Sequence, residues 1–290
     1  MGVWLAQSAH HRAAYWRLKA AWGRAERLTA LRPKPFHPAS GEENRGRLKP
    51  LLHFAAVACF ALAVIFTSIY LWPASEETYA TAVGGQAKVT LADGSRVQLN
   101  TDTAIAVSMN AGRRTITLKK GEAFFDVVHD ASRPFYVLAA GHRIIDLGTQ
   151  FAVKTGNGRV EVTLVEGRAR LETADPAIQH HATDLVPGEV AIATANSLSV
   201  SNVTPSGIKN ALAWQQGKLV FSHVTLAEAA EQFNRYNRTK LVIGPEIASL
   251  KISGTFEAGS INAFASMAQV ALGLHTEKKK SEIVISRNTP

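Results

Sequence analysis

One stretch of the chain, residues 51–72, contains no Asp, Glu, Lys or Arg over 22 positions. A helix rises about 1.5 Å per residue, so this stretch would extend roughly 33 Å, enough to cross the hydrocarbon core of a bilayer. A cleaved signal peptide has a shorter apolar run behind a shorter basic start, and a buried core helix keeps a polar periodic face that is missing here. We therefore predict one transmembrane helix.

Positive charge is concentrated ahead of this stretch. Residues 1–50 hold ten Lys and Arg against three Asp and Glu, in a chain whose formal net charge is +9. Basic residues that flank a span remain on the cytoplasmic side, and Arg45, Arg47 and Lys49 lie directly before it. We expect a single pass through a bacterial inner membrane, with the N-terminus in the cytoplasm and the C-terminus in the periplasm. The membrane topology then accounts for the excess of Lys and Arg, and we expect no direct binding of nucleic acid.

The part of the chain after the span can form no disulfide, because the one cysteine, Cys59, lies inside the span. A domain of about 200 residues is large enough to be stable through its own core. Common catalytic and metal motifs are also missing, since the sequence has no HExxH, no CxxC and no Walker phosphate loop. We therefore expect neither an enzyme nor a bound metal or cofactor.

The N-terminal head reads as a helix over residues 1–32, followed by a basic, proline-rich linker over residues 33–50. Tyr15, Leu18, Trp22 and Ala25 recur at three- and four-residue spacing and would form an apolar stripe on a basic helix. Such a stripe suits either a helix that lies on anionic lipid or a helix that binds a partner protein. The residues alone leave both open.

The pattern changes to period two after the span. Residues 87–92 and 95–99 alternate around Asp93-Gly94, which predicts a hairpin. About ten short strands follow up to residue 204, among them residues 114–118 and 123–128, which the Lys120-Gly121 pair separates. We predict an all-β domain over residues 76–204, built as a sandwich, a roll or a solenoid.

Several short motifs in this part resemble the FecR family of proteins. They are LADGSRV at residues 91–97, GEAFFDV at 121–127, RPF at 133–135, LGTQFAV at 147–153, VEG at 165–167 and PGE at 187–189. Most of their residues read as scaffold, with turn glycines, strand-entry positions and core aromatics. The scaffold residues are Asp93, Gly94, Gly121, Glu122, Phe125, Pro134, Phe135, Gly148, Thr149, Phe151 and Gly167.

The resemblance implies an anti-sigma factor in the inner membrane. Members of that family relay a signal from a TonB-dependent outer-membrane receptor to a cytoplasmic sigma factor of the extracytoplasmic-function class, in iron or other nutrient uptake. A membrane-embedded protease makes the final cut inside the span. The partners to expect are therefore the sigma factor, the periplasmic signalling domain of the receptor, and a site-2-type protease.

The remaining chain reads as a small α+β domain over residues 212–288, after a linker at Pro205-Ser206-Gly207. Two strand–helix–strand patterns of similar length follow one another, which predicts two βαβ-like units and a final hairpin. This part resembles the short domain at the N-termini of secretins and TonB-dependent transducers. The resemblance implies a contact with the receptor, with candidate residues Leu219, Phe221, Leu226, Phe233 and Phe256.

The head, residues 1–32, resembles only the last portion of a family anti-sigma domain. Either the true start lies upstream of Met1, or this head is a shortened remnant. Its candidate sigma contacts are Trp4, Leu5, His11, Arg12, Tyr15, Trp16 and Trp22. The fold class that follows is a multi-domain membrane protein, with a helical head, one span, an all-β periplasmic domain and a C-terminal α+β domain. An alternative is a membrane-anchored periplasmic module for ligand binding or assembly, with a vestigial head.

Overall fold

The computed structural model describes Lys19 and residues 76–288 except 111, 147 and 175–181. The predicted helical head, the linker and the predicted span at residues 51–72 lie outside these residues. Among the helices of the described residues, none has the length and apolar character needed to cross a membrane. The residues from 76 onward belong to one compact unit, Pro73–Pro290.

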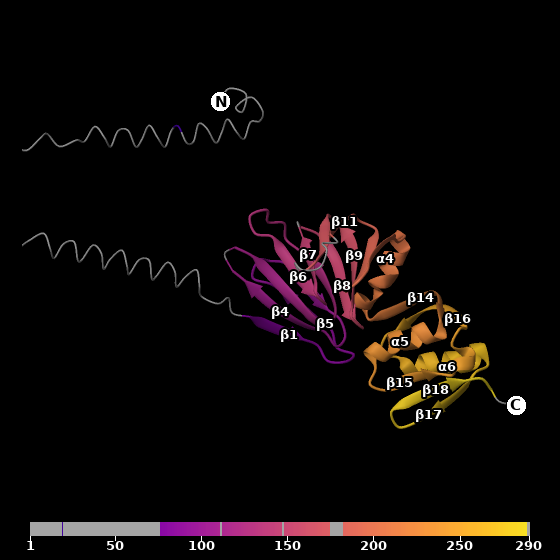
Figure 1. Ribbon diagram of the computed structural model, residues 1–290. Coiled ribbons are helices and arrows are strands. Elements are labelled where there is room, and N and C mark those ends of the chain that lie inside the picture. Colours follow the sequence, from indigo (N-terminus) through magenta and orange to yellow (C-terminus); the bar gives the residue numbers. More distant parts are fainter. Residues whose placement is uncertain (1–18, 20–75, 111, 147, 175–181, 289–290) are drawn as a thin grey trace, which may run out of the picture. The chain divides into compact units, whose positions relative to one another are not determined.

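Strand β5 (Arg114–Asp126) is the central element of the β-region, which we define as residues 77–202. Its first half lies between β4 (Ala104–Met109), which is antiparallel, and β6 (Phe135–Ala139), which is parallel. Its second half lies between β3 (Arg96–Leu99) and β8 (Gln150–Gly156), both antiparallel. One strand therefore belongs to two sheets, and Figure 1 shows β5 among its neighbours β4, β6 and β8.

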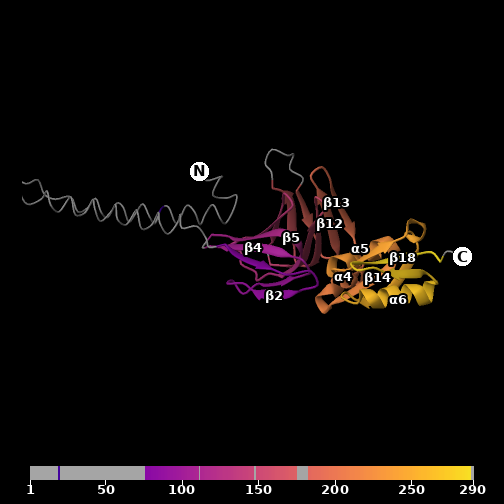
Figure 2. The same ribbon diagram turned by 90° about the horizontal axis from the view of Figure 1, so that it is seen from below.

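The first sheet has the order β11-β10-β7-β6-β5-β4-β1, and the second has the order β2-β3-β5-β8-β9-β12-β13. Figure 2 shows β2 and β13 apart, at opposite edges of the second sheet. The further strands are β1 (Glu77–Ala80), β2 (Ala87–Thr90), β7 (His142–Asp146), β9 (Arg159–Glu166), β10 (Ala169–Thr173), β11 (Ala182–Leu185), β12 (Glu189–Thr194) and β13 (Leu198–Asn202).

The two sheets enclose one hydrophobic core, to which both contribute fully buried side chains. Phe125 stacks on Phe151 at a centroid distance of 5.0 Å and meets the edge of Phe135 at 6.3 Å. Because Phe135 belongs to the first sheet and Phe151 to the second, these rings join the two sheets. The predicted all-β character of this part is confirmed, and the hairpin at Asp93-Gly94 is present as β2 and β3.

The expected break at Lys120-Gly121 was wrong, because β5 continues through it. Gly121 has φ +89°, and a Cβ at this position would collide with Thr103. A glycine here lets the backbone turn from one sheet into the other while the pairing of the strand goes on. The sequence reading also missed the short strands β1 and β11 at the edges of the first sheet.

The α+β region, which we define as residues 205–286, begins with a helix where we expected a linker. Thr204 caps helix α4 (Pro205–Ala211), because its hydroxyl accepts a hydrogen bond from the Gly207 amide at 3.2 Å. Proline is well tolerated in the first helical turn, so Pro205 starts the helix and does not prevent it. The following elements are η1 (Ala213–Gln216), β14 (Lys218–Thr225), α5 (Leu226–Tyr236), β15 (Lys240–Ile243), η2 (Pro245–Ile247), β16 (Lys251–Glu257), α6 (Ile261–Leu272), β17 (His275–Lys278) and β18 (Glu282–Ser286).

The order strand–helix–strand occurs twice, but the strands of each unit do not pair with one another. Strand β14 pairs with β16, whereas β15 pairs with β18 in parallel and β17 pairs with β18. Each helix thus leads from one small sheet to the other. Four rings pack against one another in the core of this region, those of Phe221, Phe233, Phe256 and Phe264. Thr225 and Glu228 form a capping box at the start of α5.

Candidate functional site

The β-region and the α+β region meet at a buried carboxylate. Glu122 follows Gly121 on β5 and is 7% exposed. Its Oε2 accepts a hydrogen bond from Nη2 of Arg235 at 2.7 Å and another from Nδ2 of Asn100 at 3.1 Å. A charge removed from water is stable only when it is paired and hydrogen-bonded, and both conditions hold here.

The last turn of α5 provides two of the residues around Glu122, Arg235 and Tyr236. The hydroxyl of Tyr236 accepts a hydrogen bond from Nδ2 of Asn100 at 2.7 Å. Burial raises the pKa of Tyr236 to about 12, and the Glu122 carboxylate adds to this rise. Burial opposes the charge of Arg235, but the neighbouring Glu122 raises the pKa of this guanidinium above its ordinary value. We call these four residues, Asn100, Glu122, Arg235 and Tyr236, the junction.

Hydrogen bonds to the main chain extend the contact on both sides of the junction. The Thr101 hydroxyl donates to the carbonyl of Arg235 at 3.0 Å. The side-chain amides of Gln86 and Gln98 donate to the carbonyls of Trp214 and Gln215, at 2.5 Å and 3.2 Å. The second sheet of the β-region is thus fixed to both α5 and η1.

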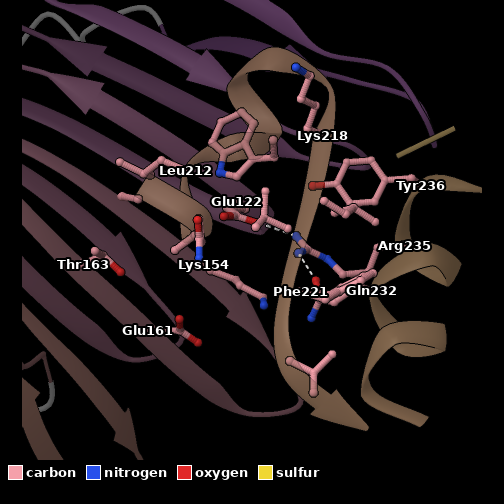
Figure 3. Close-up of a pocket in the computed structure, with 17 residues that line it drawn as sticks. Glu122, Lys154, Glu161, Thr163, Leu212, Lys218, Phe221, Gln232, Arg235 and Tyr236 are labelled. Atoms are coloured by element: carbon pink, nitrogen blue, oxygen red, sulfur yellow. Dashed lines mark hydrogen bonds and ion pairs between the residues drawn. The ribbon is translucent and has the colours of Figure 1, made fainter. Parts of the chain in front are cut away.

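A pocket of about 240 Å³ lies beside the junction, between the second sheet and β14, α5 and η1. Figure 3 shows Glu122 and Arg235 facing one another, with Lys154 and Glu161 on the strands of the sheet. Lys154 and Glu161 are direct partners across β8 and β9. Trp214, Phe221 and other aromatic or aliphatic side chains complete the wall, so the pocket combines an apolar lining with a few charged groups.

A second buried ion pair lies within the β-region. Asp93 and Arg114 are joined at 2.8 Å, with side chains that are 4% and 1% exposed. Arg114 also donates to the carbonyls of Val128 and Arg133, each at 2.9 Å, and its guanidinium lies 5.3 Å from the ring of Phe135. Burial alone would raise the pKa of Asp93, but hydrogen bonds from Arg114 and Ser95 outweigh it and hold the pKa below its ordinary value.

The other residues that we expected to form the scaffold lie in turns and in the core. Gly94, Gly148 and Gly167 have φ of +85°, +102° and +86°. The Pro134 carbonyl accepts from the Arg114 amide at 3.3 Å, and the Thr149 hydroxyl donates to Asp146. Phe125, Phe135 and Phe151 are fully buried. Glu122 differs from these, because one of its partners, Arg235, lies in the α+β region.

The candidate receptor contacts do not lie on the surface. Four of them are at most 7% exposed, and the fifth packs against the same hydrophobic core. They are Leu219, Phe221, Leu226, Phe233 and Phe256. In this conformation their side chains pack in the hydrophobic core of the α+β region. The candidate sigma contacts from Trp4 to Trp22 lie outside the described residues.

The sequence reading missed Arg114, Arg235, Tyr236 and Trp214. Arg235 and Tyr236 end a helix that the reading did find, but nothing local distinguishes them from solvent-facing residues. Their partners are more than 100 positions away in the sequence. In the described part of the chain, no three His, Cys, Asp or Glu side chains gather as a metal site would require.

Comparisons with known proteins agree with the resemblance. A family model described as "FecR protein" matches residues 77–170, so the expected FecR character is confirmed there. Two crystal structures described as a "putative anti-sigma factor" from Parabacteroides distasonis ATCC 8503 have the same fold, each with a TM-score of 0.61 and 24% identity. The matches cover 74% and 73% of this chain and 100% of each of those chains. No curated protein matches the chain.

Proposed function

We propose that the protein is a single-pass inner-membrane anti-sigma regulator, because a FecR family model matches residues 77–170. Its head binds a sigma factor of the extracytoplasmic-function class in the cytoplasm. Its β-region and α+β region lie in the periplasm, where they receive a signal from a TonB-dependent outer-membrane receptor during uptake of iron or another nutrient. A membrane-embedded protease then releases the sigma factor by a cut inside the predicted span.

The observation that carries this proposal is the FecR match, which covers the whole series of strands from β1 to the start of β10. The fold shared with the Parabacteroides distasonis structures supports it over a wider range, since these matches cover 74% and 73% of the chain. Neither region presents a recognisable catalytic constellation among the described residues. A regulator that works through protein contacts is consistent with such an architecture.

The junction provides a physical route for the signal. The α+β region is fixed to β5 by the hydrogen bonds of Arg235 and Tyr236 with Glu122 and Asn100. Strand β5 pairs with β4, and β4 pairs with β1, the first strand after the predicted span. A displacement of the α+β region by a receptor would therefore reach the segment that leads to the membrane through only two strand pairings.

The experiment that tests the proposal compares two forms of the protein in a host that lacks the gene. One form is the full chain, and the other lacks residues 1–32. We expect the full chain to restore the transcript levels of the sigma-dependent genes and the shortened form to leave them unrestored. Full activity of the shortened form would instead favour an anchored periplasmic module with a vestigial head. A reading frame for a sigma factor beside the gene would support the regulator.

A further inference from the structure

The pocket beside the junction contains a buried donor that has no acceptor. Trp214 is 3% exposed and lines the pocket, and its indole Nε1 has no hydrogen-bond partner among the described residues. Leaving a buried N–H unpaired costs about 1–3 kcal/mol, and such groups are rare in folded proteins. The indole nitrogen is a donor only, so it needs a ligand group with a free acceptor lone pair, such as an oxygen.

A free cation lies in the same pocket. The ammonium group of Lys154 forms no ion pair and no hydrogen bond with the described residues, although Glu161 is its direct partner across the two strands. It also lines the two neighbouring hollows, of about 360 Å³ and 410 Å³, which share further residues with the first. The pocket is therefore the inner end of a longer groove between the second sheet and α5, and Lys154 belongs to each part of it.

Two further cations, Lys218 and Arg235, line the pocket. The Lys218 ammonium forms no ion pair with the described residues, whereas the Arg235 guanidinium is already paired. Arg235 is neutralised by Glu122, which also accepts from Asn100. Glu161 adds a second carboxylate to the lining. A doubly charged phosphate favours a cluster of free arginines, and it would be repelled by the carboxylates here. A singly charged carboxylate requires only one cation and one or two donors, and Lys154 and the Trp214 N–H provide them.

We propose that this pocket binds the carboxylate of a small ligand or of a peptide C-terminus. The carboxylate oxygens accept from the Trp214 indole and from Lys154, and the aromatic wall receives the attached carbon atoms. Glu161 then favours a ligand that carries an N–H donor next to its carboxylate, as an amino acid and a peptide end both do. A volume of about 240 Å³ suits a group of amino-acid size.

The test follows the indole N–H signal of Trp214 in the ¹⁵N-labelled full chain by NMR. The Trp214→Phe variant, checked for folding by circular dichroism, identifies the signal because it keeps an aromatic ring and removes the N–H. The probes are alanine, trialanine with a free C-terminus, and trialanine amide. We expect a saturable downfield shift with at least one free-carboxylate probe and none with the amide. Tighter binding of alanine would assign a free amino acid, and tighter binding of trialanine would assign a chain end.

The variant Lys154→Met is expected to weaken this binding at least about tenfold, because it removes the cation and keeps the aliphatic chain. Lys278→Met is the matched control, since Lys278 is an exposed lysine on β17 outside the pocket, and it should leave the binding unchanged. The proposal is overturned if no probe shifts the Trp214 signal at millimolar concentration, if the amide binds as well as the acid, or if Lys154→Met binds like the control. None of these results would affect the proposed sigma-factor contact.

Discussion

Arg235, in the last turn of α5, donates to Glu122 on β5 across 113 positions of sequence, at 2.7 Å. The pair joins the α+β region to the strand that both sheets of the β-region share. Its side chains are 24% and 9% exposed, so water screens it only in part. We expect this contact to contribute to stability and to hold the two regions in one arrangement.

Replacing Arg235 by Met should lower the free energy of unfolding by about 2 kcal/mol, because Glu122 is left buried without its countercharge. Urea denaturation of the two proteins measures the difference. The matched control is Arg170→Met, which removes an ion pair whose side chains are 53% and 69% exposed. Solvent screens an exposed pair and leaves it little effect on stability, so equal losses for the two variants would contradict the role of the junction.

The stability of the protein should depend on Tyr236 at high pH. Its pKa in the folded protein is about 12, against an ordinary value of 10.0. Between these values the unfolded chain has lost the proton and the folded chain has kept it, so stability falls as pH rises, by about 1.4 kcal/mol per pH unit from this group. We expect wild type to lose stability relative to Tyr236→Phe over this range, as followed by urea midpoints. Parallel curves for the two proteins would show that the hydroxyl is not held in its neutral form.

The ion pair between Asp93 and Arg114 should be a strong determinant of folding in the β-region. Asp93→Asn leaves the buried guanidinium of Arg114 without a carboxylate, which should cost about 3 kcal/mol. Because the pKa of Asp93 is lowered in the folded protein, its contribution is present above the ordinary pKa of aspartate and is lost as pH falls through the folded value. As the pH is lowered, the free energy of unfolding should therefore fall more steeply for wild type than for Asp93→Asn. An equal slope for the two proteins would show that the Asp93 carboxylate does not stabilise the fold.

Gly121→Ala should destabilise the protein by more than about 2 kcal/mol, because a Cβ there collides with Thr103 in addition to the cost of the positive φ. Gly141→Ala is the control, since its φ is +77° and a Cβ there meets nothing within 4 Å. We expect about 1 kcal/mol for the control, from the backbone alone. Thermal or urea unfolding measures the loss of stability for each variant. A similar loss for Gly121→Ala and Gly141→Ala would mean that β5 adapts to the added side chain.

Local chemistry made some of these elements predictable from the sequence. Asp93-Gly94 fixes a hairpin, and Thr225 with Glu228 fixes the start of α5, because each depends on residues a few positions apart. Strand β5 continues through Gly121 next to Thr103, which lies in the connection between β3 and β4. The local pattern does not show this neighbour, so Lys120-Gly121 was interpreted as a break between two strands. The pairing of β14 with β16 and the junction itself join residues far apart in the chain, which periodicity does not reveal. The candidate receptor contacts were chosen for their apolar character, and that same character buries them.

The most direct test of the proposed function is a pull-down of the tagged full chain from its native host, with the bound proteins identified by mass spectrometry. A form that lacks residues 1–32 serves as the control. The account predicts that a sigma factor of the extracytoplasmic-function class copurifies with the full chain and not with the shortened form. If no such protein is bound by the full chain, or if the shortened form binds it equally well, the head is not the sigma-binding element and the account is contradicted.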